Sequence, residues 1–383
     1  MVHPQPLPVP ARHPGRGGRT GQVALSVLGA LLIAVCAVVV TVVVLLSVGV
    51  GAFWTALLAA SLPVLPLVWV YGWLDRHEPE PRGLLLFAFG WGAAVATAFS
   101  LLFSLPPTLA VQALGGDADI VGAVLVAPLV EEGFKGLGLL AVLLVGRRAL
   151  DGLVDGFVYA GLVGIGFAFT ENVLYLGTAV TDGGSGGLVA TFVVRAVVSP
   201  FAHPLFTAAT GVGIVLASHR RGTARVVIGV TGFAVAVLLH GLWNGMAVGG
   251  IGGFATTYLV MWVPLFVAVV ALALVARSRQ ARTVRTGVAL YAQHGWLSPQ
   301  EQQMLGSVGP RRQAQRAARR AGVARSMRRF QTAAVDLAHL RARMAGGSAP
   351  WDAAAREQDL LHRLGAARSE LDRGGRTSPR PHV

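Results

Sequence analysis

The stretch Ile120-VGAVLVAPLVEEGFKGLGLLAVLLV-Gly146 decides the fold. It is long enough to cross a lipid bilayer, which takes about 20 mainly apolar residues in a helix. It nevertheless contains Glu131, Glu132 and Lys135, and Lys135 is the only lysine in the chain. A charged side chain at bilayer depth costs about 3 kcal/mol on insertion scales, so such groups face a bundle interior or a water-filled cavity. The three charges therefore predict a buried functional site inside a membrane helix.

The composition excludes an ordinary soluble domain. Of the 383 residues, 54% are hydrophobic and 13% are charged, and the mean hydropathy is +0.62. These values are typical of a multispanning membrane protein. The single cysteine, Cys36, excludes a disulfide framework and a cysteine-based metal site. A net charge of +14 would suggest nucleic-acid binding in a soluble protein, but 20 of the 32 basic residues follow residue 276. We therefore place the excess in a tail and expect no nucleic-acid partner.

The apolar windows predict an all-α fold, a polytopic membrane helix bundle of about eight transmembrane helices. The predicted spans are residues 23–49, 52–74, 83–105, 120–145, 152–176, 189–217, 225–247 and 253–276. We expect three regions: a disordered basic N-terminal arm (1–22), a transmembrane domain (23–276) and a basic cytoplasmic helical tail (277–383). Pro106 and Pro107 predict the start of a short re-entrant or surface segment, and Pro200 and Pro204 predict kinks in the sixth span.

The distribution of arginine predicts the orientation of the chain. Arginines occur in the N-terminal arm and in the loops after the second, fourth and sixth spans, whereas the other four loops contain no arginine or lysine. Under the positive-inside rule, this alternation places both termini in the cytoplasm. We expect a multi-pass protein of a bacterial cell membrane, in contact with the lipid bilayer.

The tail has the pattern of soluble helices. Ser298-Pro-Gln-Glu301 forms a capping box with proline at the first helical position. Helical spacing predicts one helix within 311–344 and a second over 352–371. Two interpretations stay open: an arm attracted to anionic lipid head groups, and a solvated helical hairpin whose charge only adds solubility.

Polar residues recur in the later spans at helical spacing. The fifth span carries Glu171 and Asn172. The sixth carries Arg195, Ser199 and His203, each four residues apart and so near one helical face, and the seventh carries His240 and Asn244 at the same spacing. With the predicted orientation, four helices bring these groups to overlapping depths in the outer half of the membrane. The predicted constellation is Glu131, Glu132, Glu171, His203, His240 and Asn244.

Such a set can activate water. A carboxylate or imidazole would act as general base, and an asparagine or histidine would donate to the developing oxyanion. Each residue alone has a simpler explanation: a lone histidine in a membrane helix is often an interhelical hydrogen-bond partner, and Glu-x-x-x-Lys is often an ion pair that neutralises itself. The joint pattern favours function, because each buried group carries its own insertion cost.

Four motifs in order also resemble the series of the PrsW family of intramembrane proteases, which is distantly related to the CAAX-protease and bacteriocin-processing group. They are Glu131-Glu132-Gly-Phe-Lys135, Phe167-x-x-x-Glu171-Asn172, His203-Pro-Leu-Phe206 and His240-x-x-Trp243-Asn244, and the resemblance covers about residues 50–276. It implies a peptidase that cuts membrane-anchored proteins such as anti-sigma factors.

The resemblance also implies roles for individual residues. Glu131 would be the base that activates water, Glu171 would assist it, and His240 and Asn244 would hold the oxyanion. Glu132 and Lys135 would orient or charge-balance the site. The remaining supporting candidates for substrate binding are Asn172, Arg195 and His203.

Two mechanisms and two other functions remain open. The site is either metal-free or holds a divalent metal such as zinc, for which Glu132, Glu171, His203 and His240 are the candidate ligands. A proton- or ion-coupled transporter could use the same buried carboxylates as a relay, although no internal repeat of the kind common in transporters is present. A catalytically inert scaffold that displays its tail is the third reading.

Overall fold

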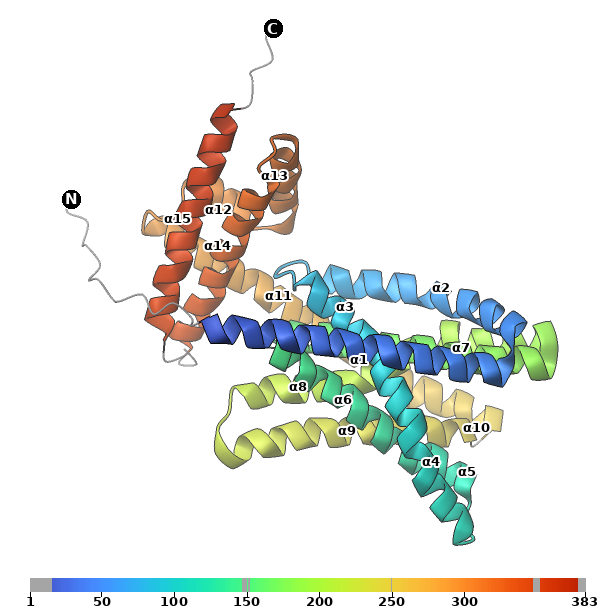
Figure 1. Cartoon of the computed structure of the whole chain (residues 1–383). Helices are drawn as coiled ribbons and strands as arrows, with labels where there is room; N and C mark the ends of the chain where they lie inside the picture. Colours follow the sequence, from blue (N-terminus) through green and yellow to red (C-terminus); the bar gives the residue numbers. More distant parts are fainter. Residues whose placement is uncertain (1–15, 147–149, 151, 249, 347–351, 378–383) are drawn as a thin grey trace. The chain divides into compact units, whose positions relative to one another are not determined.

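The computed structural model describes residues 16–146, 150, 152–248, 250–346 and 352–377. All regular secondary structure in these residues is helical, which confirms the all-α prediction (Figure 1). The chain divides into two compact units. The membrane unit comprises Gly15–Asp75 and Glu80–Leu274; the tail unit includes Arg76–Pro79 and the chain from Val275 onward.

The helices of the membrane unit follow one another with short connections. They are α1 (Arg16–Val48), α2 (Val50–Leu74), α3 (Arg82–Gly90), α4 (Thr97–Ala113), α5 (Ala118–Val121), α6 (Ala127–Val145), α7 (Leu153–Phe192), α8 (Ala202–Ser218), α9 (Gly222–Val248), α10 (Gly250–Thr257) and α11 (Val263–Gln293). Four segments with the wider π-helical turn lie between them: η1 (Trp91–Ala96), η2 (Gly122–Val126), η3 (Val193–Val198) and η4 (Tyr258–Trp262). Such turns occur frequently at functional sites.

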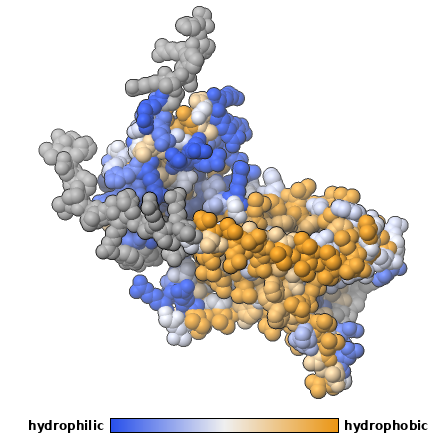
Figure 2. All heavy atoms as spheres, in the orientation of Figure 1, coloured by the Kyte–Doolittle hydropathy of each residue, from blue (hydrophilic) through white to orange (hydrophobic). Residues whose placement is uncertain are grey.

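Six helical stretches of the described chain are long and apolar enough to cross a membrane. They are Val23–Val48, Val50–Leu74, Arg82–Ala113, Leu153–Ser218, Gly222–Ala247 and Phe254–Gln293. The stretch Leu153–Ser218 has 66 residues and contains both α7 and α8, and α6 coincides with the predicted span that carries three charges. The polytopic prediction is confirmed, and the number eight is approximate. Figure 2 shows apolar side chains over much of the visible face of the membrane helices, as contact with lipid requires.

Three local predictions need correction. The predicted disordered arm (1–22) lies mostly outside the described residues, and its end, from Arg16 on, is the first part of α1. Pro106 and Pro107 lie inside α4 and start no separate segment, because a membrane helix can tolerate the lost hydrogen bonds. In the predicted sixth span the chain does more than kink: helical structure ends at Val198 and resumes at Ala202.

The fifth and sixth predicted spans meet inside α7. Gly184 has φ 57° and ψ −143°, so two helical segments join there. The first of them is the central helix of the membrane unit, since every residue from Val154 to Phe167 is buried. Small residues allow this close packing. A Cβ atom on Gly164 would lie 2.7 Å from the backbone nitrogen of Pro204, so this glycine lets the start of α8, with His203, reach α7.

The tail unit is a helical bundle with its own apolar core. α11 continues into it from the membrane unit, and α12 (Pro299–Leu305), α13 (Val308–Arg320), α14 (Ala324–Ala345) and α15 (Ala353–Thr377) complete it. The predicted capping box is confirmed, because the Ser298 hydroxyl accepts from the Glu301 N–H and the Glu301 carboxylate accepts from the Ser298 N–H. The predicted helix within 311–344 is two helices, α13 and α14, separated near Gly322, whose φ is 73°. The core residues are Val284, Val288, Tyr291, Leu297, Leu305, Phe330, Ala333, Ala334, Val335, Leu337, Leu364 and Ala367.

The short loop Arg76–Pro79 is part of the tail unit although it lies between α2 and α3 in the sequence. The Glu78 carboxylate accepts from Gln280 Nε2 at 3.0 Å and lies 3.0 Å from His339 Nε2. Arg311 Nη1 donates to the His77 carbonyl at 2.9 Å. Burial, and after it the charges of Arg277, Arg311 and Arg285, lowers the pKa of His77 to about 4. The tail helices therefore hold this loop through side chains from three of them.

The residues on either side of this loop belong to the membrane unit. Asp75 ends α2, and its carboxylate accepts from the Glu80 N–H at 3.0 Å. Burial raises the pKa of Asp75 to about 7, against the opposing effect of that hydrogen bond. The Glu80 carboxylate in turn accepts from the Tyr159 hydroxyl of α7 at 2.7 Å. The turn into α3 is thus fixed to the central helix.

Candidate active site

Helix α6 supplies three charged side chains to the interior of the membrane unit. Glu132 and Lys135 are fully buried, and Glu131 is 9% exposed. Lys135 Nζ donates to Glu132 Oε1 at 2.8 Å and to Glu131 Oε2 at 3.3 Å, and it lies 3.1 Å from His203 Nδ1. The ammonium also lies 3.8 Å from the ring centroid of Phe167. Because an ammonium has three hydrogens, these contacts use all of its donors.

Glu132 is enclosed by hydrogen bonds. Its Oε2 accepts from the Thr207 hydroxyl at 3.1 Å, and its Oε1 accepts from His240 Nδ1 at 3.1 Å in addition to Lys135. A carboxylate only accepts, so the neutral form of His240 carries its proton on Nδ1 and has Nε2 as its unprotonated nitrogen. That free nitrogen faces Glu131, at 3.8 Å from Oε2. Glu132 therefore orients His240 toward Glu131.

His203 has the opposite proton arrangement. Its Nδ1 faces the Lys135 ammonium, which can only donate, so the proton lies on Nε2. Nε2 donates to Glu171 Oε2 at 2.7 Å. The ring packs beside Phe167 and His240, with centroids 5.3 Å and 5.1 Å away. His203 thus links the Lys135 ammonium to Glu171.

Arg195 completes the charge balance around Glu171. Arg195 Nη2 forms an ion pair with Glu171 Oε2, and its Nε donates to Asn172 Oδ1 at 2.6 Å. The guanidinium stacks over the Tyr175 ring, 4.0 Å from the centroid. Three acidic side chains, Lys135 and Arg195 therefore lie in one connected cluster with two imidazoles.

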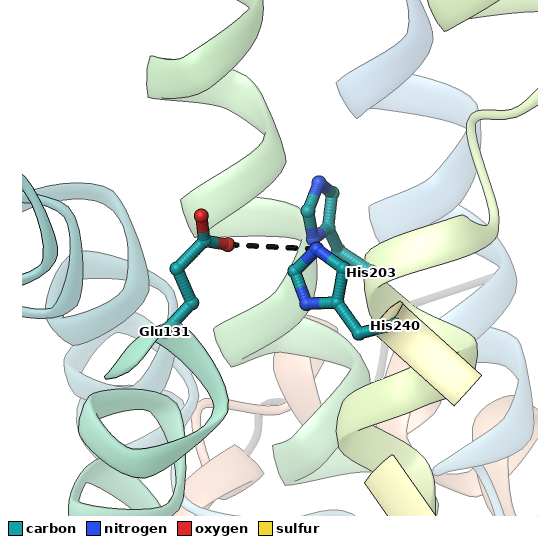
Figure 3. A group of neighbouring side chains, drawn as sticks. All are labelled: Glu131, His203 and His240. Carbon is teal, nitrogen blue, oxygen red and sulfur yellow. Dashed lines mark ion pairs between the residues drawn. The ribbon is translucent and has the colours of Figure 1, made fainter. Parts of the chain in front are cut away.

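Glu131, His203 and His240 form a group that can hold a divalent metal. Each offers one ligand atom, and these atoms lie within 4.8 Å of one another (Figure 3). Two imidazoles and one carboxylate are a donor set of catalytic zinc sites, and the carboxylate that orients His240 is the usual outer partner of a zinc-bound histidine. The residues thus fit a metal in type and spacing. Because Lys135 and Glu171 already engage both nitrogens of His203, ligation by His203 requires one of these contacts to give way.

The structure brings together most of the predicted site but changes its arrangement. The candidate ligand group contains Glu131 where the sequence favoured Glu132 and Glu171, which are held by other partners. Asn244 Nδ2 donates to the Ala123 carbonyl of η2 at 2.8 Å. Arg195, Ser199 and His203 do not share one helix, and the Ser199 hydroxyl donates to the Val194 carbonyl. Arg195 and His203 nevertheless meet, because both bind Glu171 Oε2.

Sequence reasoning missed Thr207, and it quoted Phe167 in a motif without giving it a role. Thr207 holds Glu132, and its position four residues after His203, on the same face of α8, was the available signal. Phe167 supplies the aromatic face beneath the Lys135 ammonium. Its position four residues before Glu171 in α7 indicated that it faces the same side.

A membrane helix bundle that collects carboxylates and imidazoles at one buried point has the groups that an intramembrane hydrolase requires. In a comparison with known protein families, residues 80–290 match the model of the PrsW family intramembrane metalloproteases. The chain therefore belongs to this family. It is a protease of the multi-pass membrane type.

Two relatives with the name Protease PrsW are similar to the chain. The chain is 28% identical to Protease PrsW of Bacillus subtilis (strain 168) over 190 residues, which is 49% of this chain and 81% of the relative. It is 30% identical to Protease PrsW of Clostridioides difficile (strain 630) over 119 residues, 30% of this chain and 49% of that protein. No solved structure matches the chain. The helices α12–α15 lie beyond the part that matches the family.

Proposed function

We propose that this protease hydrolyses peptide bonds of membrane-anchored proteins by water that Glu131 activates. The carrying observation is the contrast among the three acidic side chains of the cluster. Glu132 is bound by Lys135, Thr207 and His240, and Glu171 is bound by Arg195 and His203. Glu131 has one hydrogen bond, from Lys135, and its Oε1 has no partner among the described residues.

Glu131 is therefore the carboxylate with capacity left for a water molecule. In the proposed reaction it takes a proton from water as the oxygen attacks the scissile carbonyl, and it later delivers that proton to the leaving amine. His240 Nε2 faces the same space and accepts a second hydrogen bond from the water. This assignment gives His240 a different role from the oxyanion donor that the family resemblance implied, because its proton lies on Nδ1.

The oxyanion requires a donor near this point. Asn244 uses one hydrogen of its amide nitrogen on the Ala123 carbonyl and keeps a second. We assign that hydrogen to the developing oxyanion. Glu171, Arg195 and His203 hold the remaining charges of the site in a fixed arrangement, which lowers the reorganisation needed when charge develops.

The same residues also support a metal-dependent form of the reaction. Glu131, His203 and His240 would hold the ion, and when bound it would polarise the carbonyl and lower the pKa of its water. In that form Lys135 balances the charge of Glu132, while His240 keeps its link to Glu132 through Nδ1–H.

Substitution of single side chains tests the site. Glu131→Gln, Glu132→Gln and His240→Ala should each abolish cleavage of a membrane-anchored reporter without loss of membrane insertion. Asp119→Asn is the matched control, because this carboxylate is exposed and lies on the short helix α5 before α6. Unchanged cleavage in the three site variants, or equal loss in the control, contradicts the proposal.

Metal content separates the two forms. The purified protein would be analysed for bound metal and assayed for cleavage after chelation. One metal per chain that is lost in Glu131→Gln and His203→Ala, with chelation abolishing cleavage, supports the metal-dependent form. Absence of stoichiometric metal with full activity after chelation supports activation by Glu131 alone.

Substrate class and orientation complete the proposal. We infer that the substrates are proteins anchored by a membrane helix, such as anti-sigma factors, as the family resemblance implies. We also propose that both termini are cytoplasmic, because the arginine-containing loops alternate with loops that have none. Reporter domains fused to each terminus, active only on one side of the membrane, test the orientation.

The tail carries a further proposal about lipids. α13 and α14 expose Arg312, Arg316, Arg319, Arg320, Arg325, Arg328 and Arg329. Within the described residues, only Arg329 of these seven has an acidic partner, Glu370. Such a surface is attracted to anionic head groups at about 1 kcal/mol per basic residue. The test compares the full-length protein with a variant in which all seven arginines are replaced by Gln. It measures the binding of each protein to anionic vesicles at low and at high salt concentration.

A further inference from the structure

An open groove of about 920 Å³ lies in the membrane unit away from the catalytic cluster. Its walls come from α4, α6, α8 and α9, with apolar residues such as Phe103, Leu137, Ile214, Val230 and Phe233. Arg225 is the one charged residue among the described residues that line it. The groove is thus apolar along its length and cationic at one end.

The groove is hollow because glycines, which have no side chain, line part of it. Gly133 and Gly136 of α6 and Gly229 of α9 line it. A Cβ atom on Gly133 would meet nothing within 4 Å, and one on Gly229 would first meet Ala217 at 3.9 Å. An unfilled hollow forfeits dispersion contacts along its walls. In a bilayer, the flexible acyl chains of lipids surround the protein and can fill this hollow.

The cationic end has two further arginines beside it. Arg220 and Arg221 precede α9, whose first residue is Gly222, and both are exposed, as is Arg225. None of the three has an ion pair or side-chain hydrogen bond with another residue of the described chain. The first N–H groups of a helix also lack intrahelical partners and favour an anion. Basic pockets between membrane helices bind anionic lipid head groups.

We propose that this groove binds an anionic phospholipid, with its phosphate at Arg225, Arg220 and Arg221 and its acyl chains along the glycine-lined floor. One polar end joined to a long apolar body is the pattern of a lipid. A partner's membrane helix would bury apolar surface in the groove equally well but would leave the three unpaired cations unexplained. The bound lipid is distinct from any head group attracted to the tail.

The position of the groove links the lipid to the active site. Val130, Gly133, Phe134 and Leu137 line the groove, whereas Glu131, Glu132 and Lys135 do not. At 100° per residue these two sets lie on opposite faces of α6. The lipid therefore packs directly behind the helix that carries the catalytic carboxylates, and an empty groove leaves that helix without support on this side.

The test measures lipid bound to the full-length protein in detergent by native mass spectrometry, with phosphatidylglycerol or phosphatidylcholine added. Each basic residue near an anionic group changes the binding constant about fivefold. Arg220→Gln, Arg221→Gln and Arg225→Gln together should therefore weaken phosphatidylglycerol binding about a hundredfold. The matched control removes three exposed arginines of the tail unit that belong to neither basic surface, Arg282, Arg341 and Arg373, and should leave this binding unchanged.

A second pair of variants tests the apolar floor. Gly133→Leu fills the groove and should reduce lipid binding for either head group. Gly51→Leu, on the exposed surface of α2 with nothing within 4 Å of its Cβ position, should not. Equal retention of the two lipids by the unmodified protein, loss only with the tail variant, no effect of Gly133→Leu, or a copurified protein helix in place of lipid would overturn the proposal.

Discussion

The ammonium of Lys135 provides the sharpest test of how the catalytic cluster is held together. Lys135→Met keeps the length of the side chain and removes its charge. Lys135 is fully buried and pairs with Glu132, also fully buried, at 2.8 Å and with Glu131 at 3.3 Å. Removing one partner of a buried pair leaves an uncompensated charge and costs about 3–5 kcal/mol. We expect the free energy of unfolding to fall by that amount.

A double-mutant cycle separates this effect from lost packing. Glu132→Gln in the same chain removes one of the carboxylates left without a partner, so the double variant should be destabilised less than the sum of the single variants. We expect a coupling of about 2 kcal/mol, within the range for residues in one ion-pair network. Unfolding is followed by tryptophan fluorescence during titration with a denaturing detergent, since the chain has 8 tryptophans.

An exposed pair of the same spacing calibrates the measurement. Arg363 and Asp359 in α15 lie 2.6 Å apart, four residues apart in sequence, with 67% and 56% of their side chains exposed. Arg363→Gln should change the thermal unfolding of the tail helices by only about 0.3–0.5 kcal/mol. If Lys135→Met costs no more than this, or if its effect and that of Glu132→Gln add without coupling, the reasoning about the buried cluster is wrong.

Three further outcomes follow from other parts of the molecule. The pKa of Asp75 is raised to about 7 by burial, so the folded state binds the proton of this carboxyl more tightly than the unfolded state does. The free energy of unfolding should therefore rise as pH falls from 7 toward 4. Asp75→Asn should flatten this rise in unfolding curves, and an unchanged slope would refute the assignment. Gly92→Ala should lower the free energy of unfolding by about 1–3 kcal/mol, because its Cβ would lie 2.0 Å from the Val163 carbonyl oxygen. The control Gly133→Ala places a Cβ that meets nothing within 4 Å. Equal effects of the two variants in detergent titration would argue against close packing of η1 on α7. Tyr159→Phe removes a 2.7 Å hydrogen bond to a carboxylate and should cost about 1.5–3 kcal/mol, which a change below 0.5 kcal/mol (about a third of the lower bound) would contradict.

The features that could be predicted from sequence are those that the bilayer enforces. An apolar window must be helical, because the backbone has no other hydrogen-bond partner in lipid. Charged and imidazole side chains within such windows must turn inward, because exposure to lipid costs too much. These two rules suffice to bring Glu131, Glu132, Glu171, His203 and His240 into one buried cluster.

The arrangement inside the cluster could not be read from the same rules. Glu131 and Glu132 are adjacent and chemically identical, and only the positions of Thr207 and His240 decide which of them is enclosed. Those contacts join residues 75 and 108 positions apart in the chain. Long-range packing sets them, and no local pattern encodes it.

Backbone irregularities account for the remaining differences. The π-helical segments η2 and η3 and the break between Val198 and Ala202 rotate the following side chains away from the positions that regular helical spacing predicts. This is why Ser199 leaves the site while Arg195 and His203 still converge on Glu171. A regular 3.6-residue repeat is the only assumption that sequence periodicity can use.

The loop held by the tail helices has a consequence for how the protein is made. During synthesis, Arg76–Pro79 leaves the ribosome about 200 to 260 residues before Gln280, Arg311 and His339, the three side chains that later hold it. At the ~5–20 residues per second of translation, the carboxylate of Glu78 waits on the order of 10 s or longer for its partners. The tail cannot be removed without affecting this loop, since truncation after residue 280 would also remove two of its partners, Arg311 and His339. A phenotype of such a truncation would report on the entry into α3 as much as on the tail itself.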